Sequence, residues 1–233
     1  MNPFVVIIPS CEELNMNACL DSIQENDPGT RVFVYANGDL ARKGTQNTDL
    51  PCAVIYDSDG GAARRFIYSR AINESVARIS EDQDLILLND DTRLLTPNGF
   101  DLLREAAYAH PECGLMFPSV TGCTGNPEQI TQPGGGVRLA KRHTVPFIAV
   151  YIRREIWNHI GPMDEQFRLD YGCEDNDYCY RVKQAGFDLG VFDGCVIEHG
   201  VLPSTYRAGG NRSFAKNAEL FRLKHGVSLW DLP

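Results

Sequence analysis

A short apolar run that ends in acidic residues is the feature that most constrains the fold. Residues 85–88 read Leu-Ile-Leu-Leu, and Asn89, Asp90 and Asp91 follow directly. A continuous apolar run of this length is typical of a strand buried on both faces of a parallel sheet. The acidic residues then lie at its carboxyl end, where open α/β sheets bind ligands and where oxygen donors suit a hard divalent cation. The alternative is a polar turn that only ends a core strand.

Strands and helices alternate over the first 95 residues, which indicates βαβ units and an α/β fold with a parallel sheet. Polar or glycine-rich turns follow the earlier strands, and in a doubly wound sheet such turns meet at one crevice. We therefore expect them to form one site with residues 89–91. The expected strands are 3–9, 31–35, 52–56 and 84–88, the helices 15–25 and 62–79, and the turns 10–13, 37–39 and 57–61.

The second half of the chain has a different composition. Residues 119–142 are rich in Gly, Thr and Pro. A connection this long inside a compact domain is usually functional or mobile, so a flap ordered by substrate is expected. Around it the pattern predicts helices at 97–110 and 153–160 and strands at 113–118, 145–152 and 189–192.

Composition excludes some classes of protein. The formal charge of −9 argues against broad binding to a nucleic-acid backbone, although a local basic pocket for a small anion is compatible with it. The eight cysteines form no CxxC pair, which makes a zinc site unlikely and favours a reduced compartment. No apolar run has the length of a membrane span and no leader precedes the first strand, so we expect a soluble, cytoplasmic protein without stable membrane insertion.

The usual nucleotide-binding signatures are absent. The sequence contains neither a GxGxxG after the first strand nor a GxxxxGK[ST] motif, which disfavours a dinucleotide fold and a P-loop. Arg64 and Arg65 instead follow two glycines near a helix start, and Arg70 lies further along. A helix amino end and an arginine can both meet a diphosphate, whereas the alternative is a solvated helix face.

A second acidic cluster begins a helix in the last third of the chain. Asp177 lies four residues before Arg181, so pairing on the helix explains it. Glu174 and Asp175 follow an aromatic residue and a glycine that suit a pocket rim, and a carboxylate there could act as a general base. His199 follows the last strand; it could complete a metal site if it faces residues 89–91, and is otherwise structural.

Taken in order, these segments resemble a known family. The matching stretches are VVIIPS at 5–10, YANGD at 35–39, SRAIN at 69–73, LLNDDT at 87–92, MDEQF at 163–167, YGCEDNDYCYRVKQAG at 171–186 and VIEHG at 196–200. The chain resembles the inverting, nucleotide-sugar-dependent glycosyltransferases of the family 2 type, which have the GT-A fold. The YGCEDND stretch is also similar to the WGxEDxD segment of galactosyltransferase-like relatives.

The resemblance implies one GT-A domain over residues 1–233. A Rossmann-like half with a mainly parallel central sheet, residues 1–95, would bind the nucleotide sugar, and residues 96–233 would bind the acceptor and carry the catalytic residues. The implied reaction is a hexosyltransferase-like transfer from a nucleotide-diphosphate sugar to an acceptor hydroxyl, with Mn²⁺ or Mg²⁺. The acceptor could be a glycan, a lipid-linked sugar, a protein or a modified nucleobase.

The site residues follow position by position. Asp175 matches the catalytic base and Glu174 an acceptor-binding carboxylate, while Asp91 and His199 match metal ligands. Ala36 stands where the family usually has an aspartate, and Asn89 replaces a charged outer ligand of the DxD motif, so metal binding would lean more on His199. The positions that match nucleotide-sugar contacts are Ser10, Glu12, Asn37, Asp59, Arg70, Asn89, Asp90 and Arg212.

Two other functions stay open. A sugar-phosphate nucleotidyltransferase typically shows a glycine-rich signature with a lysine near the first strand, and residues 5–15 have neither. A non-catalytic sugar- or nucleotide-binding protein of the same fold is compatible with Ala36 and Asn89. The pair of Glu174 and Asp175 speaks against it.

Overall fold

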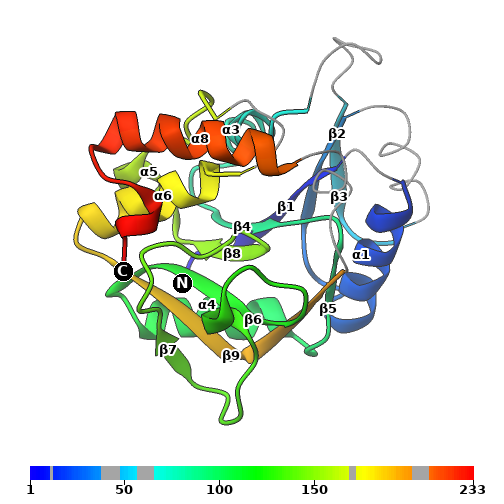
Figure 1. The fold of residues 1–233 in the computed structure, drawn as a ribbon. Coiled ribbons are helices and arrows are strands. Elements are labelled where there is room, and N and C mark those ends of the chain that lie inside the picture. Colours follow the sequence, from blue (N-terminus) through cyan, green and yellow to red (C-terminus); the bar gives the residue numbers. More distant parts are fainter. Residues whose placement is uncertain (11–12, 38–47, 57–65, 168–171, 201–209) are drawn as a thin grey trace.

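The computed structural model describes residues 1–10, 13–37, 48–56, 66–167, 172–200 and 210–233, with only the backbone described at 13–14, 56 and 210–213. One mixed sheet runs through these residues (Figure 1), in the order β3-β2-β1-β4-β8-β6-β9-β5, with β7 paired to β9. The strands are β1 (Phe4–Ser10), β2 (Val32–Ala36), β3 (Cys52–Tyr56), β4 (Asp84–Leu88), β5 (Thr92–Leu94), β6 (Cys113–Gly122), β7 (Val137–Leu139), β8 (Ala149–Ile152) and β9 (Asp188–His199).

The first half of the sheet confirms the predicted α/β fold. β1 pairs in parallel with both β2 and β4, and β2 pairs in parallel with β3. In the second half β8 runs antiparallel to β4 and β6, while β6 and β9 are parallel. β4 is buried at every residue, as its apolar sequence predicts for a central strand.

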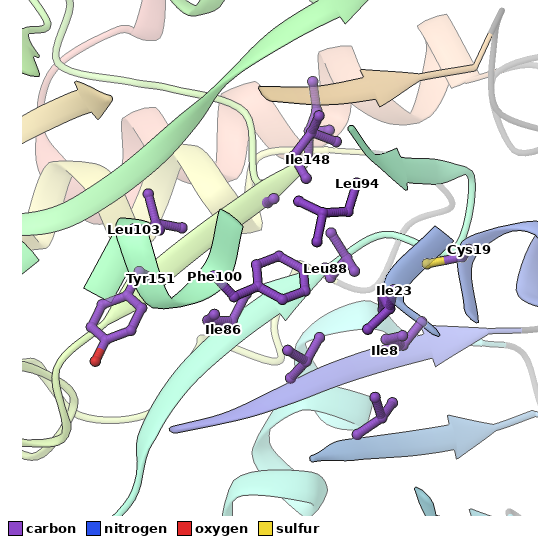
Figure 2. Packing of buried hydrophobic residues seen from close by; sticks show 14 of the residues in the cluster. Ile8, Cys19, Ile23, Ile86, Leu88, Leu94, Phe100, Leu103, Ile148 and Tyr151 are labelled. Carbon is purple, nitrogen blue, oxygen red and sulfur yellow. The ribbon is translucent and has the colours of Figure 1, made fainter. Parts of the chain in front are cut away.

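Helices cover both faces of the sheet and enclose two hydrophobic cores. One core contains side chains of α1 and α4 against β1, β4 and β8; Figure 2 shows Ile8, Ile86, Leu88 and Phe100 within it. The other core lies on the opposite face, under α3, α5 and α6. The helices are α1 (Glu13–Asn26), α3 (Tyr68–Val76), α4 (Gly99–Ala109), α5 (Arg154–Ile160), α6 (Glu174–Gln184) and α8 (Gly210–His225), with 3-10 turns η3 (Pro127–Gln129) and η4 (Leu229–Asp231).

α8 forms a third layer beside α6 (Figure 1). Phe221 of α8 is fully buried in a small apolar cluster with Phe167 and Cys173. The sequence did not predict this helix. None of the helices in the described part of the chain is long and apolar enough to cross a lipid bilayer.

The region 119–142 differs from the expected flap. β6 continues to Gly122, and η3 and β7 follow, with β7 paired to β9. Arg138 anchors it, because its Nε and Nη2 donate to the buried carboxylate of Asp193 at 2.5 and 2.9 Å. The side chain of Glu128 accepts the N–H groups of Lys141 and Arg142, each at 3.1 Å. Side-chain hydrogen bonds to the backbone therefore hold a segment whose composition predicted a loose connection.

Other elements also differ from the sequence prediction, and β8 begins at Ala149 and not at residue 145. α3 begins at Tyr68 and not at residue 62, with the part before residue 66 outside the described residues. β9 is 12 residues long, far beyond the predicted 189–192. β5 was not predicted at all, and it is the strand that brings residue 92 beside residue 199.

Candidate active site

The carboxyl ends of β1, β2 and β4 meet, as the sequence predicted for neighbouring parallel strands. Ser10 at the end of β1 donates its hydroxyl hydrogen to Oδ2 of Asp90 at 2.5 Å. The N–H of Asn37, just after β2, donates to the carbonyl of Ser10 at 2.8 Å. Glu12 and Asp59, the other expected nucleotide contacts near these ends, lie outside the described residues.

The turn after β4 is shaped by its own backbone and by β8. Asn89 donates its N–H to the carbonyl of Ile148 at 2.9 Å, and Thr92 donates its hydroxyl to the carbonyl of Asn89 at 2.6 Å. The chain then returns as β5, which pairs antiparallel with β9 so that Thr92 lies opposite His199. This register places Nε2 of His199 3.3 Å from Oδ1 of Asp91.

His199 is held like a metal-binding histidine. Its Nδ1 bonds to the carbonyl of Cys123, and because a carbonyl only accepts, Nδ1 carries the proton. Nε2 is buried, makes no well-formed hydrogen bond with the described residues, and faces the Asp91 carboxylate at 3.3 Å. Burial alone would lower the pKa of His199, but Asp91 and the Cys123 carbonyl outweigh it and raise the pKa. A histidine whose second nitrogen donates to a carbonyl is the usual arrangement around a bound metal.

The residues present fit a divalent cation. Among the described residues no group of three His, Cys, Asp or Glu side chains is placed to bind a metal, and Asp91 and His199 would supply two donors. The buried Nε2 beside a carboxylate is the observation that favours the site, because an uncharged nitrogen there gains nothing from that carboxylate without a proton or a cation. Catalytic cations often take their remaining ligands from water and substrate phosphates.

The second acidic cluster lies at the start of α6. The backbone reaches it through Gly172 and Cys173, both at positive φ (85° and 79°). Oδ1 of Asp175 accepts the N–H of Asn176 at 2.7 Å, and the backbone N–H of Phe147 is close enough to the same carboxylate to lower its pKa. Both carboxyl groups of the pair are partly buried, and no Lys, Arg or His of the described residues lies within ion-pair distance of them.

This environment changes the acidity of the pair. Burial and the neighbouring Asp175 raise the pKa of Glu174 to about 8. Burial also raises the pKa of Asp175, while the N–H groups of Asn176 and Phe147 oppose that shift. Two carboxyl groups this close release their protons in coupled steps that belong to the pair. Strongly shifted carboxyl pKa values are often found at acid–base sites.

The two acidic clusters contact consecutive residues of one segment. Ile148 accepts the N–H of Asn89, and the N–H of Phe147 acts electrostatically on the Asp175 carboxylate. These two residues lie immediately before β8, which pairs with β4. The predicted metal-side turn and the predicted base are therefore joined through adjacent peptide units.

Tyr68 is a site residue that the sequence did not indicate. Its hydroxyl is buried and has no hydrogen-bond partner among the described residues, and burial together with the charges of Glu174 and Asp175 raises its pKa. A phenolic hydroxyl left unpaired beside two carboxyl groups can be satisfied by a polar ligand. The available signal was an aromatic hydroxyl directly before the SRAIN stretch.

The structure says less about the arginines that the sequence predicted to contact the nucleotide sugar. Nε of Arg70 lies 3.5 Å from Oε2 of Glu165, and the arginine side chain is 21% exposed. Arg212 falls within α8, where only its backbone is described, and Arg64 and Arg65 lie outside the described residues. Contacts of these arginines with a nucleotide sugar stay predictions.

The sequence matches no protein-family model, and no curated protein is similar to it. A solved structure described as "GalNAc-T7 with UDP, GalNAc and Mn2+" superposes with a TM-score of 0.69 at 11% sequence identity. The match covers 94% of this chain and 48% of that chain, so this protein spans about half of that structure's length. At this identity the likeness concerns architecture alone: the chain has the mixed α/β, Rossmann-like fold of GT-A glycosyltransferases.

Proposed function

We propose that the protein transfers a sugar from a nucleotide-diphosphate sugar to an acceptor hydroxyl, with inversion at the anomeric carbon. The observation that carries the proposal is the pair of Glu174 and Asp175: partly buried, without a cation among the described residues, and hydrogen-bonded next to the segment that holds Asn89. A structural acidic residue at a helix start is normally solvated or ion-paired. This pair has the environment of a proton acceptor.

In the proposed step Asp175 accepts the proton of the acceptor hydroxyl as its oxygen bonds to the anomeric carbon. The bond from that carbon to the diphosphate oxygen breaks on the opposite face, and the diphosphate leaves with the electron pair. Glu174, whose pKa is raised by burial and by the neighbouring Asp175, donates a hydrogen bond from its protonated carboxyl to the acceptor or the donor sugar. The Tyr68 hydroxyl offers a further polar contact in the same place.

Asp91 and His199 would hold Mn²⁺ or Mg²⁺ in this proposal. The cation would offset the charge that develops on the leaving diphosphate. His199 is kept in the ligand tautomer by the Cys123 carbonyl, and Ser10 keeps the neighbouring Asp90 carboxylate directed to the end of β1. Asn37, Asp90 and Arg70 remain the proposed donor contacts among the described side chains.

We further propose that residues 1–95 bind the donor and that residues 96–233 supply the acceptor site and the base. The solved structure with the same fold contains UDP, GalNAc and Mn²⁺, which makes UDP-sugars the first donors to test.

The deciding experiment incubates the protein with a panel of nucleotide sugars and Mn²⁺ and follows release of the nucleoside diphosphate. Slow hydrolysis of one donor, abolished in Asp175→Asn, supports the proposal, and NMR of a transfer product then tests for an inverted anomer. Binding of a donor without turnover favours a non-catalytic binding protein. Release of pyrophosphate from a nucleoside triphosphate and a sugar phosphate identifies a nucleotidyltransferase.

A further inference from the structure

We propose that α8 is a positioning element for the acidic pair, with Asn217 and Lys224 as its positioning residues. They hold the backbone on either side of Glu174 and Asp175, so the position of the carboxylates depends on a helix that does not contribute them. The positioning itself concerns the fold, and only its kinetic consequence rests on the proposed function.

The first contact is immediately before the pair. Asn217 is 1% exposed, and its Nδ2 donates to the carbonyl of Gly172 at 2.8 Å. Gly172 has a φ of 85°, and a Cβ added there would lie 2.6 Å from the ring of Phe214, also on α8. The helix thus approaches the chain so closely that only glycine fits.

The second contact is two residues after the pair. Asp177 is fully buried, and its Oδ1 accepts from Nζ of Lys224 at 2.6 Å and from Nε2 of His225 at 2.7 Å. Arg181 of α6 donates to Oδ2 at 2.9 Å. The sequence predicted only the Arg181 pair, whereas two of the three partners come from α8.

Lys224 also bonds to a third segment of the chain. Its Nζ also donates to Oδ2 of Asp164 at 2.7 Å. The N–H of Met163, the residue before, donates to Asn73 of α3 at 2.9 Å. One ammonium group therefore joins α8, α6 and the segment that α3 holds, and partly buried charge-assisted bonds of this kind are stronger than neutral ones.

Proton transfer tolerates only a small displacement of the base, so the position of the Asp175 carboxylate matters for catalysis. The Asp175 carboxylate must stay within hydrogen-bond reach of an acceptor hydroxyl. A displacement of about 1 Å in such a group can cost about 100-fold in rate. Loosening the contacts of α8 should therefore lower kcat without weakening donor binding, because most of the expected donor contacts lie on other elements.

The test compares Lys224→Met with Arg222→Met. The two residues lie two positions apart on α8, but Arg222 pairs with Glu219 of the same helix and is half-exposed. Hydrogen exchange of the amides at 174–178 is measured in both variants, together with kcat and the donor KM. We expect Lys224→Met to speed this exchange at least about tenfold and to lower kcat by roughly 10–100-fold. The donor KM stays within about twofold, Lys224→Arg restores most of the rate, and Arg222→Met behaves as wild type.

The outcomes separate this inference from the proposed function. If wild-type protein transfers no sugar, the proposed function fails, while the exchange measurement still decides whether α8 positions the turn. Unchanged exchange at 174–178 in Lys224→Met overturns the inference, as does faster exchange accompanied by an unchanged kcat in an active enzyme. If Lys224→Met does not fold, Asn217→Ala, which removes the hydrogen bond to the Gly172 carbonyl, takes its place under the same criteria.

Discussion

The two acidic turns of the molecule are built in opposite ways. In the turn after β4, Asp90 accepts a hydrogen bond from Ser10 and Asp91 faces His199. At the start of α6, the described residues give Glu174 and Asp175 no cation, and the Asp175 carboxylate accepts the backbone N–H of Asn176. A turn whose carboxylates already have protein neighbours is suited to hold a fixed ligand set. A turn whose carboxyl groups favour the protonated form is suited to exchange protons.

The same contrast appears within α6 itself. Asp175 and Asp177 are two residues apart, yet Asp177 is surrounded by Arg181, Lys224 and His225. Three potential cations keep a fully buried carboxylate paired, which is a structural role. We therefore assign proton transfer to Asp175 and structural anchoring to Asp177, two carboxylates on the same helical turn. Substitutions can test each assignment.

The largest expected effect is that of Asp175→Asn. The amide cannot accept the acceptor proton, so we expect turnover to fall by about 100- to 10,000-fold while donor affinity stays within about twofold. Product release and donor binding by calorimetry measure the two quantities. Asp101→Asn, in the first turn of α4, is the matched control and should transfer normally. Near-normal transfer by Asp175→Asn would show that another group is the base.

Asp177→Asn should destabilise the fold, because Asp177 anchors the start of α6 to α8. Removing one partner from a buried ion pair costs about 3–5 kcal/mol, and because the three partners here are partly exposed we expect about 2–3 kcal/mol. For a chain of this size that corresponds to a Tm lower by roughly 5–10 °C. Thermal unfolding followed by circular dichroism measures it.

The matched control for Asp177→Asn is Glu219→Gln. Glu219 makes a surface pair with Arg222 within α8, and its loss should leave Tm unchanged. If both variants lowered Tm equally, the contrast between an anchoring and a reactive carboxylate would lose its basis.

Local pattern predicted the elements that are locally determined. The buried run 85–88, the polar turn after it and the acidic start of α6 were all readable from sequence, because period and helix-end chemistry are local properties. The contact of Asp91 with His199 depends on β5, a strand of three residues whose pairing no local signal specifies. Lys224 and His225 reach Asp177 from 47 and 48 residues away, and the isolation of Asp175 is visible only once its surroundings are in place.

Asp91→Asn and His199→Gln should weaken metal-dependent donor binding. Loss of even an outer-shell partner typically costs 10–100-fold in metal affinity, and we expect a loss of roughly that size for a direct ligand. The measurement is the Tm gain given by UDP with increasing Mn²⁺, a gain that EDTA should remove. His110→Gln, at an exposed histidine paired with Glu112, is the control. A UDP-induced gain that is independent of Mn²⁺ would contradict the assigned metal site.

The smallest expected effect is a pH-dependent stabilisation by Glu174→Gln. The pKa of Glu174 is raised from 4.5 to about 8 in the folded protein, so folding favours the protonated carboxyl. Its contribution to stability is complete below about pH 4.5 and is lost as the pH rises through about 8. Glutamine stays uncharged, so the variant should match wild type near pH 4.5 and exceed it above pH 8.

Since Glu174 is partly exposed and coupled to Asp175, we expect that excess to be about 1–2 kcal/mol, or roughly 3–6 °C in Tm. Glu105→Gln, at an exposed position of α4, should give a difference from wild type that does not change with pH. A flat difference for Glu174→Gln as well would mean that the carboxyl ionises as it does in the unfolded chain. The start of α6 would then be no more suited to proton exchange than the turn after β4.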